Sequence, residues 1–414
     1  MVKKNRVVVT GMGILAPNGI GLDAFWESLV AGRSGIGPIT LFDASDFKSR
    51  IAGEVKGFDP LEYIEPELKP KRMARHTQLA YAATMMALRD AGLDPDNLEL
   101  PSPTPVIIGI STSAIDVIES VYFSLQNNGP NRAPITSASA SIPQAAANTI
   151  ADRIGTSAHA TTVSSACPSG LDAIADAAEM IRSGEAEIAI AGGADAPITP
   201  LTMASFIASG MSSTRNGDPE KASRPFDLER DSGVISEGAG VFVLEDAERA
   251  EARDARVYLE IEGYGKQRDL DPTKPGSGLE DSMAIALANA ACSTTDIDYI
   301  SAYGPSHPVL DVVEVSAIRK VFGGRAYAIP VSSIKGVTGN PLAAGGPFQV
   351  AACALSFRDQ LIPPTANYEV QDPRCDLDFV PNRARKTRVG WALVNVRGIG
   401  GSASTMIVSR NGSY

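Results

Sequence analysis

A short segment at residues 161–170, TTVSSACPSG, carries the side chain best suited to nucleophilic chemistry. Cys167 ends a run of small residues typical of a strand, and a pattern with helical spacing begins at Gly170. The free N–H groups and partial positive charge of a helix N-terminus favour a thiolate over a thiol. Pro168 suits the first helical position because it lacks an N–H. The alternative is a small buried hydrophobic residue, the usual state of a free Cys, and the local pattern favours neither.

Three further segments concentrate glycine, proline or charge. Residues 223–244, SRPFDLERDSGVISEGAGVFVL, favour a structural loop with a buried salt-bridged core over direct chemistry. Residues 331–346 place Lys335 and Asn340 in a Gly-rich loop that opens a helix. Residues 395–402, NVRGIGGS, contain glycines that let the backbone approach a ligand closely.

Other motifs argue against two common kinds of site. There is no GxxxxGK[ST], and no GxGxxG lies between a strand and a helix, so nucleotide binding has little support. No CxxC pair suggests a zinc site, and we predict no metal. Cys292, Cys353 and Cys375 lie in helical or loop settings, which favours core or incidental positions.

The elements that must hold these residues follow an α/β pattern, because β-branched runs alternate with Ala-rich helical stretches. Strands are predicted at residues 6–10, 106–110, 187–191, 240–245, 257–263, 297–302, 388–395 and 404–409. Helices are predicted at residues 77–91, 170–183, 282–291, 309–322 and 347–359. Several strands are apolar throughout, as expected for strands covered on both faces.

The composition of the 414-residue chain indicates a globular enzyme in a reducing compartment, which we expect to be cytoplasmic. A net charge of −11 argues against nucleic-acid binding, and no apolar run is long enough to span a membrane. RVVVTGMGILAP near the start and YLEIEGYGKQ after residue 257 are both strands that lead into Gly-x-Gly. We therefore predict two related halves, residues 1–255 and 256–414, in one compact unit.

Taken together, these segments resemble the β-ketoacyl-[acyl-carrier-protein] synthases, in particular the elongating branch, synthase II. The resemblance runs from VVVTGMGILAPNGIGLDAFWESLVAGRSGIGPITLFD through the Cys167 turn, IAGGADAPITP and SRPFDLERDSGVISEGAGVFVLE to KGVTGNPLAAGG and NVRGIGGSAS. It implies a thiolase-like αβαβα five-layered sandwich and a homodimer. It also implies a substrate carried on the phosphopantetheine of an acyl carrier protein, with no bound cofactor.

The resemblance assigns roles to individual residues. Cys167 matches the nucleophile that takes the acyl chain, and its N–H, with that of Ile399, matches the oxyanion hole. Lys335 and Glu314 match the supporting Lys and Glu, expected as an ion pair that orders the site.

Both catalytic His of the family are replaced. AHGT becomes Ala302-Tyr303-Gly304-Pro305, and TGH becomes Thr338-Gly339-Asn340. The initiating synthases of this family use Cys, His and Asn, so Asn340 is compatible with catalysis. Tyr303 can donate a hydrogen bond but is a poor base at pH 7. We expect malonyl decarboxylation to be weak or absent, whereas acyl transfer onto Cys167 can persist.

The resemblance also places an acyl gate and a docking patch. Ile399 replaces the Phe that gates the acyl pocket, and Arg397 adds a charge beside it. Carrier-protein docking falls on a basic cluster before residue 77, although a solvated positive face is as good an interpretation on charge alone. The cluster comprises Lys69, Lys71, Arg72 and Arg75.

Three functions remain open. The preferred one is a carrier-dependent acyltransferase in fatty acid or polyketide biosynthesis, with decarboxylative condensation altered or lost. The second is a non-catalytic partner of an active ketosynthase in a heterodimer, like a chain-length factor; the retained Cys167 argues against it. The third is ordinary ketosynthase activity, with Tyr303 and Asn340 substituting for the two His.

Overall fold

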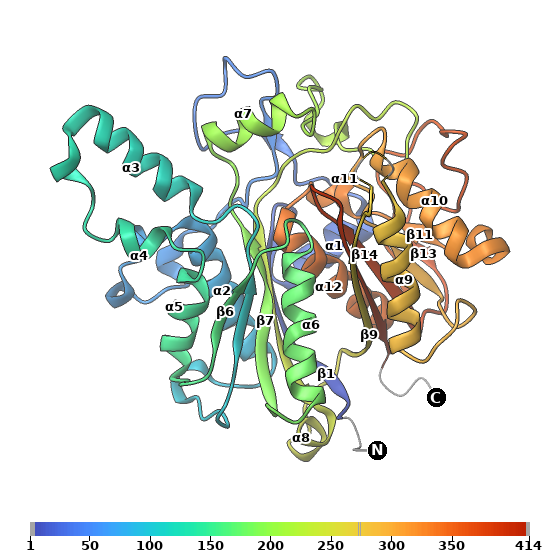
Figure 1. Ribbon diagram of the computed structural model, residues 1–414, viewed down its shortest axis with the longest axis horizontal. Coiled ribbons are helices and arrows are strands. Elements are labelled where there is room, and N and C mark those ends of the chain that lie inside the picture. Colours follow the sequence, from blue (N-terminus) through green and yellow to red (C-terminus); the bar gives the residue numbers. More distant parts are fainter. Residues whose placement is uncertain (1–4, 272, 274, 411–414) are drawn as a thin grey trace.

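Most of the β-strands form one mixed sheet that runs through the whole molecule (Figure 1). The computed structural model describes residues 5–271, 273 and 275–410. Strands from the first part of the chain are β1 (Val7–Ala16), β5 (Val106–Gly109), β6 (Ala160–Val163), β7 (Ile188–Asp195) and β8 (Gly238–Asp246). Those from the second part are β9 (Leu259–Arg268), β10 (Tyr299–Ser301), β11 (Val331–Ser332), β14 (Trp391–Arg397) and β15 (Ser402–Ser409). The order is β11-β10-β14-β15-β9-β1-β8-β7-β5-β6, so β1 and β9 join the two sets at the centre.

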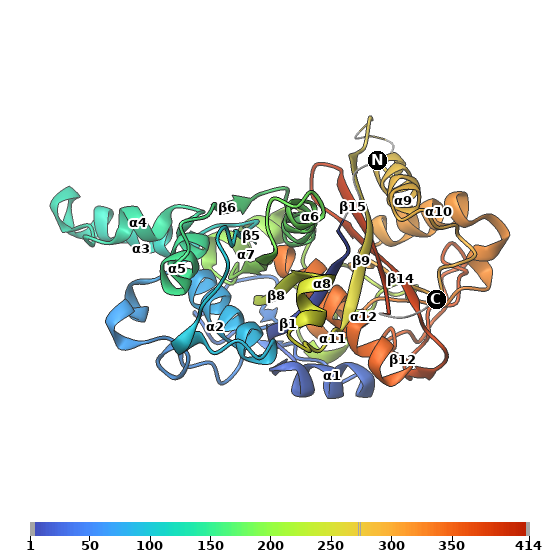
Figure 2. The same cartoon turned by 90° about the horizontal axis from the view of Figure 1, so that it is seen from below.

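Helices cover both faces of the sheet (Figure 2). Their bounds are α1 (Leu22–Ala31), α2 (Arg75–Asp90), α3 (Ile115–Asn128), α4 (Ser137–Ser141), α5 (Ala145–Ile154), α6 (Ser169–Arg182), α7 (Pro200–Ala208), α8 (Ala247–Ala252), α9 (Ser277–Asn289), α10 (Leu310–Phe322), α11 (Lys335–Thr338) and α12 (Gly345–Asp359). Helices α6 and α12 pack on each other between the two sets of strands, and every residue of α12 from Gly345 to Phe357 is buried. Outside them, α2 covers β1 and β8, while α9 covers β9 and β15. This arrangement gives the five predicted layers.

The remaining strands are short: β2 (Gly19–Ile20) pairs with β1, β3 (Gly37–Pro38) with β4 (Ile51–Ala52), and β12 (Leu361–Ile362) with β13 (Arg385–Lys386). Within the described residues, no helix is both long and apolar enough to cross a bilayer.

Every strand and helix predicted from periodicity corresponds to an observed element, with ends that differ by a few residues. The predicted apolar face of α6, which includes Leu171, Ile174 and Ile181, is fully buried. Helix α3 was not predicted. None of its residues is buried, although Ile118, Tyr122 and Leu125 follow helical spacing, so its apolar face does not contribute to the core.

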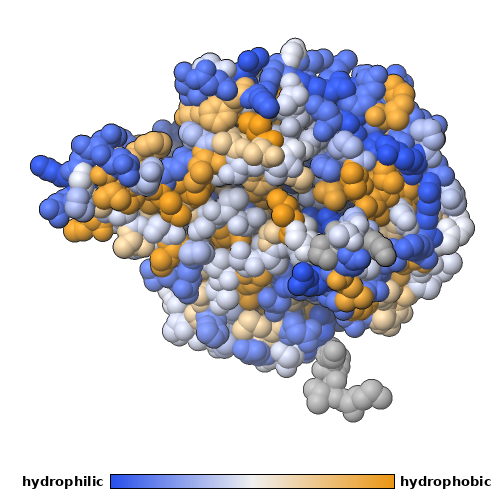
Figure 3. All heavy atoms as spheres, turned by 45° about the horizontal axis from the view of Figure 1, so that its top comes forward, coloured by the Kyte–Doolittle hydropathy of each residue, from blue (hydrophilic) through white to orange (hydrophobic). Residues whose placement is uncertain are grey.

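Helices α3 and α4 project from the body as an arm (Figures 1 and 2). Its surface is rich in apolar side chains, as the lobe at the left of Figure 3 shows. The large exposed apolar residues of this arm are Ile118, Tyr122, Phe123, Leu125, Ile135 and Ile142. Exposed apolar patches of this kind mark interaction surfaces.

Candidate active site

The turn that carries Cys167 joins β6 to the start of α6. Pro168 already has helical angles and α6 begins at Ser169, so Cys167 lies at a helix N-terminus as predicted. The residue before it, Ala166, has a φ of 65°, a left-handed conformation that is strained for a side chain other than Gly. The Ser169 hydroxyl supports this turn by accepting the Ser165 N–H at 2.9 Å and donating to the Ala166 carbonyl at 2.5 Å.

The environment of Cys167 differs from the expectation of a resting thiolate. The residue is only 3% exposed. Burial raises the pKa of its thiol, and the Tyr303 hydroxyl and the Lys335 ammonium oppose that rise only in part. Burial therefore opposes the effect expected of the helix terminus, because desolvation disfavours the charged form.

Tyr303 is the residue that contacts the sulfur. Its hydroxyl donates to Cys167 Sγ at 3.7 Å. Burial and the neighbouring Cys167 raise the pKa of Tyr303 well above its usual value, so it stays a neutral donor. The Asn340 side chain interacts with the Tyr303 hydroxyl and opposes this rise. Tyr303, which contacts Cys167, and Asn340, which interacts with Tyr303, thus come together at the nucleophile turn from separate parts of the sequence.

Glu314 and Lys335 both support Tyr303, but they do not form the predicted direct ion pair. The Glu314 carboxylate accepts the backbone N–H groups of Tyr303 at 2.9 Å and Gly304 at 2.8 Å. Lys335 Nζ lies 4.6 Å from the centroid of the Tyr303 ring, a cation–π contact. Burial lowers the pKa of Lys335 to about 8, opposed by the charge of Glu314. Glu314 thus binds the backbone of the Tyr303 segment, whereas Lys335 lies on the Tyr303 ring.

Asn340 is held by its backbone. Its N–H donates to the Val234 carbonyl at 2.7 Å, and its carbonyl accepts the Ser236 N–H at 3.0 Å. Its side-chain Oδ1 is buried without a hydrogen-bond partner among the described residues. The site therefore retains an unused acceptor next to Tyr303.

The Gly-rich loop after β14 lies against the nucleophile turn. A Cβ on Gly398 would come within 2.9 Å of Pro168 Cδ and 3.0 Å of Ala166 Cβ, so only glycine fits this approach. Ile399 follows at the tip and is 59% exposed, so its side chain points outward. The Arg397 side chain is buried and pairs with Asp269 at 2.5 Å. The charge of Arg397 is thus neutralised by Asp269, in the segment before α9.

The basic cluster separates into two parts. Lys69, Lys71 and Arg72 are exposed, and Lys69 and Arg72 line a groove of about 360 Å³ beside α4 and α5. Arg75 instead pairs with the buried Glu237 at 2.6 Å and stacks on Phe58. Arg75 thus has an ion-pair partner within the fold, and its place in the docking patch stays a prediction.

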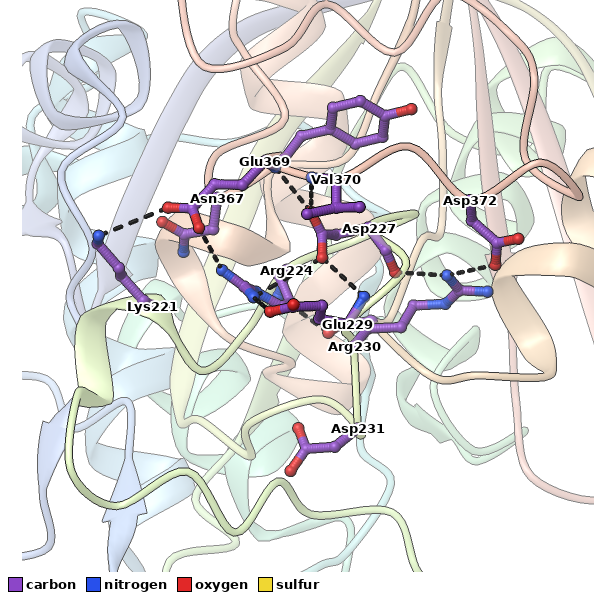
Figure 4. A network of polar contacts seen from close by, with 12 residues as sticks. Lys221, Arg224, Asp227, Glu229, Arg230, Asp231, Asn367, Glu369, Val370 and Asp372 are labelled. Carbon is purple, nitrogen blue, oxygen red and sulfur yellow. Dashed lines mark hydrogen bonds and ion pairs between the residues drawn. The ribbon is translucent and has the colours of Figure 1, made fainter.

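The loop at residues 223–244 forms the expected salt-bridged core (Figure 4). Arg230 pairs with Asp372 at 2.9 Å and with Asp311 at 3.4 Å. Arg224 pairs with Glu229 at 3.1 Å and with Glu369 at 3.2 Å. These contacts hold the segment beneath the site without placing a reactive group in it.

None of the three His enters the site. His307 Nδ1 accepts the N–H groups of Val309 at 3.1 Å and Leu310 at 3.3 Å, and so caps the start of α10. His76 is buried in α2, and His159 is exposed. No group of His, Cys, Asp and Glu among the described residues is arranged to hold a metal.

Sequence reasoning missed a buried carboxylate beside the site. Asp195, at the end of β7, accepts the backbone N–H groups of Thr112 at 2.8 Å and Ala343 at 2.9 Å. Burial raises its pKa to about 6, and its charge raises the pKa of Cys167. The only signal was an acidic residue that ends an apolar strand.

Comparison with solved structures defines the class of protein. The ishigamide ketosynthase/chain length factor superposes with a TM-score of 0.92 at 34% identity, over 99% of this chain and 100% of that one. A type II polyketide ketosynthase in complex with its acyl-carrier protein gives a TM-score of 0.90 at 32% identity, over 98% and 99%. The fold is therefore the thiolase-like fold of the ketosynthases, as predicted.

Sequence comparison identifies the family. The model of the beta-ketoacyl synthase N-terminal domain matches residues 4–250, and that of the C-terminal domain matches residues 258–369. A putative polyketide beta-ketoacyl synthase 1 of Streptomyces cyaneus is 41% identical over 98% of both chains. A 3-oxoacyl-[acyl-carrier-protein] synthase 2 of Synechocystis is 38% identical, again over 98% of both. The chain belongs to the beta-ketoacyl synthase family.

Proposed function

We propose that this protein is a ketosynthase-type acyltransferase that loads an acyl chain from an acyl carrier protein onto Cys167, in polyketide or fatty acid biosynthesis. The observation that carries the proposal is the retained thiol at a helix N-terminus, with the Tyr303 hydroxyl 3.7 Å from its sulfur. Similar proteins act in both pathways by name. The four free cysteines fit a reducing, cytoplasmic setting.

In the loading step, Cys167 Sγ forms a bond to the thioester carbonyl and the bond from that carbon to the pantetheine sulfur breaks. The thiol proton passes to the departing pantetheine sulfur. The N–H groups of Cys167 and Ile399 would stabilise the oxyanion, which the contact of Gly398 with the nucleophile turn supports. Because Cys167 is only 3% exposed, loading also requires the residues that cover its sulfur to move aside.

Decarboxylative condensation is the step that the substitutions weaken. A neutral Tyr303 donates one hydrogen bond, and its raised pKa makes it a poor base. Loss of one electrostatic donor costs on the order of a hundredfold in rate. We therefore propose that malonyl groups are decarboxylated slowly or not at all.

The carrier protein is proposed to dock at Lys69, Lys71 and Arg72. These exposed cations stand on a chain of net charge −11 and line the groove beside α4 and α5. A local positive patch speeds the association of an acidic partner by long-range electrostatic attraction. Support comes from a structural relative described in complex with an acyl-carrier protein.

We further propose that the protein is a dimer through the apolar arm of α3 and α4. A second copy of the chain is the preferred partner, and an active ketosynthase is the alternative. One observation favours this alternative: the site lacks both His, and a structural relative is a ketosynthase/chain length factor. In that case the chain would act as the non-catalytic subunit.

Intact mass spectrometry distinguishes these functions. The purified protein is exposed to an acyl-loaded carrier and, separately, to a malonyl-loaded carrier, with Cys167→Ala as the control. The expected result is an acyl adduct that the control lacks, with little carbon dioxide released from malonyl carrier. No adduct on the wild-type protein would contradict acyl loading and favour the non-catalytic subunit. Rapid carbon dioxide release would favour ordinary ketosynthase activity.

A further inference from the structure

A buried carboxylate lies behind the nucleophile turn. Asp172, in the first turn of α6, has no exposed surface. Its Oδ1 accepts the hydroxyls of Tyr264 at 2.5 Å and Ser404 at 2.6 Å. Its Oδ2 accepts the Ser165 hydroxyl at 2.6 Å and pairs with Lys266 Nζ at 2.6 Å. Four donors on one carboxylate satisfy a charge that would otherwise be costly to bury.

These donors come from both sides of the site. Ser165 belongs to the nucleophile turn, two residues before Cys167. Ser404 belongs to β15, and Tyr264 and Lys266 belong to β9. Asp172 therefore connects the helix that begins at the nucleophile to two strands from the other part of the chain.

The same connection reaches the Gly-rich loop. The Ser402 hydroxyl donates to the Ser165 carbonyl at 3.0 Å, and the Gly398 N–H donates to the Ser402 carbonyl at 2.8 Å. Ser165 is thus held by Asp172 through its side chain and by Ser402 through its backbone. Between Ser165 and Cys167 lies Ala166 in its strained left-handed conformation. A strained turn persists only where its surroundings hold it.

We propose that Asp172 is a positioning residue that fixes the Cys167 turn relative to the Gly-rich loop, acting through Ser165. The inference rests on the proposed acyl loading for its catalytic consequence, because the two oxyanion N–H groups belong to these two segments. A displacement of about 1 Å at such a site costs up to roughly a hundredfold in rate. Tyr264 and Lys266 serve mainly to neutralise and solvate the carboxylate.

The test compares two variants, each of which removes one hydroxyl group that donates a hydrogen bond to the Asp172 carboxylate. Ser165→Ala removes the bond that leads to the nucleophile, and Tyr264→Phe removes one that does not. For each, we measure the kcat and KM of acylation by acyl-loaded carrier, the rate of Cys167 alkylation by iodoacetamide, and the melting temperature. Ser165→Thr, which restores a hydroxyl, tests rescue.

We expect Ser165→Ala to lower kcat for acylation by about tenfold or more, with KM little changed. Its alkylation rate should change by at least about threefold, and Ser165→Thr should restore both rates. Tyr264→Phe should lower the melting temperature and leave both rates within about threefold of wild type. Equal kinetic effects of the two hydroxyl deletions, or none from Ser165→Ala, would overturn the inference.

Failure of the proposed function gives a different pattern. A wild-type protein that is alkylated but never acylated would contradict acyl loading alone. The difference between Ser165→Ala and Tyr264→Phe in alkylation rate would still decide whether Asp172 holds the turn.

Discussion

Among single residues, those around the Cys167 sulfur define the site. The Tyr303 hydroxyl donates to Cys167 Sγ. Lys335 makes a cation–π contact with the Tyr303 ring, and Glu314 accepts the Tyr303 backbone N–H. A phenol in this position donates a hydrogen bond but does not exchange a proton near neutral pH. The arrangement can therefore donate a hydrogen bond to the sulfur. It is less suited to decarboxylation, which needs proton transfer and stabilisation of a developing negative charge.

Tyr303→His should restore part of the missing chemistry. The variant would carry Cys, His and Asn, the set that the initiating synthases of the family use. We expect carbon dioxide release from malonyl carrier to rise by about tenfold or more over wild type. The measurement is the release of labelled carbon dioxide. The double variant Tyr303→His, Cys167→Ala serves as a control, because it shows how much carbon dioxide is released without condensation. An unchanged rate would show that more than the residue type at this position limits decarboxylation.

Tyr303→Phe should make the Cys167 thiol less reactive. The hydroxyl lowers the pKa of Cys167 against the effect of burial, so its removal raises that pKa further and reduces the thiolate fraction. A rise of one pKa unit would slow alkylation by iodoacetamide about tenfold at a fixed pH below the pKa. Tyr299→Phe is the matched control, because Tyr299 is equally buried and its hydroxyl bonds Ser332 instead. Identical pH profiles for both variants would contradict the assigned contact.

Among the elements, the first turn of α2 shows how packing separates the basic cluster into exposed and partly buried side chains. Arg75 turns inward to Glu237, and the next residue, His76, is fully buried. Burial lowers the pKa of His76 to about 4, with the charge of Asp116 opposing it. Its Nδ1 has no hydrogen-bond partner among the described residues. This turn therefore holds a neutral imidazole that resists protonation.

The buried His76 should make stability depend on pH. Between about pH 4 and 6.5 the unfolded chain protonates this imidazole and the folded chain does not. The unfolded state then binds more protons, so stability rises with pH across this window and is lost as pH falls. The contribution is on the order of 3 kcal/mol.

The measurement is denaturant unfolding at pH 4.5, 5.5 and 6.5, which should show a flatter pH dependence in His76→Gln. His159→Gln, at an exposed position, should keep the wild-type slope. A wild-type slope in His76→Gln would show that other groups cause the acid sensitivity.

At the scale of the whole molecule, two features organise function. The turn after β6, which carries Cys167, meets the Gly-rich loop after β14, although these two strands lie far apart in the order of the sheet. The arm of α3 and α4 leaves the body with an apolar surface (Figure 3). The first feature assembles the chemistry, and the second is suited to bind another protein.

Charges placed on the arm should prevent association. In the double variant Phe123→Glu, Ile135→Glu, each carboxylate would be buried unpaired in the proposed interface at a cost of about 3 kcal/mol or more. A cost of that size weakens a dimer by more than roughly a hundredfold. Light scattering coupled to size-exclusion chromatography should report a monomer. Tyr327→Glu, at an exposed residue away from the arm, should remain dimeric. A wild-type protein that is monomeric alone and associates only with an active ketosynthase would support the heterodimer.

The family, the α/β class and the position of Cys167 at a helix start could be predicted from the amino-acid sequence. These depend on periodicity and on short contiguous motifs, so they can be read locally. Three features could be found only in the folded protein: burial raises the pKa of Cys167, Lys335 lies on the Tyr303 ring instead of pairing with Glu314, and Arg75 pairs with the buried Glu237. Desolvation, and contacts between residues 32 and 162 positions apart in the chain, exist only once the layers have packed.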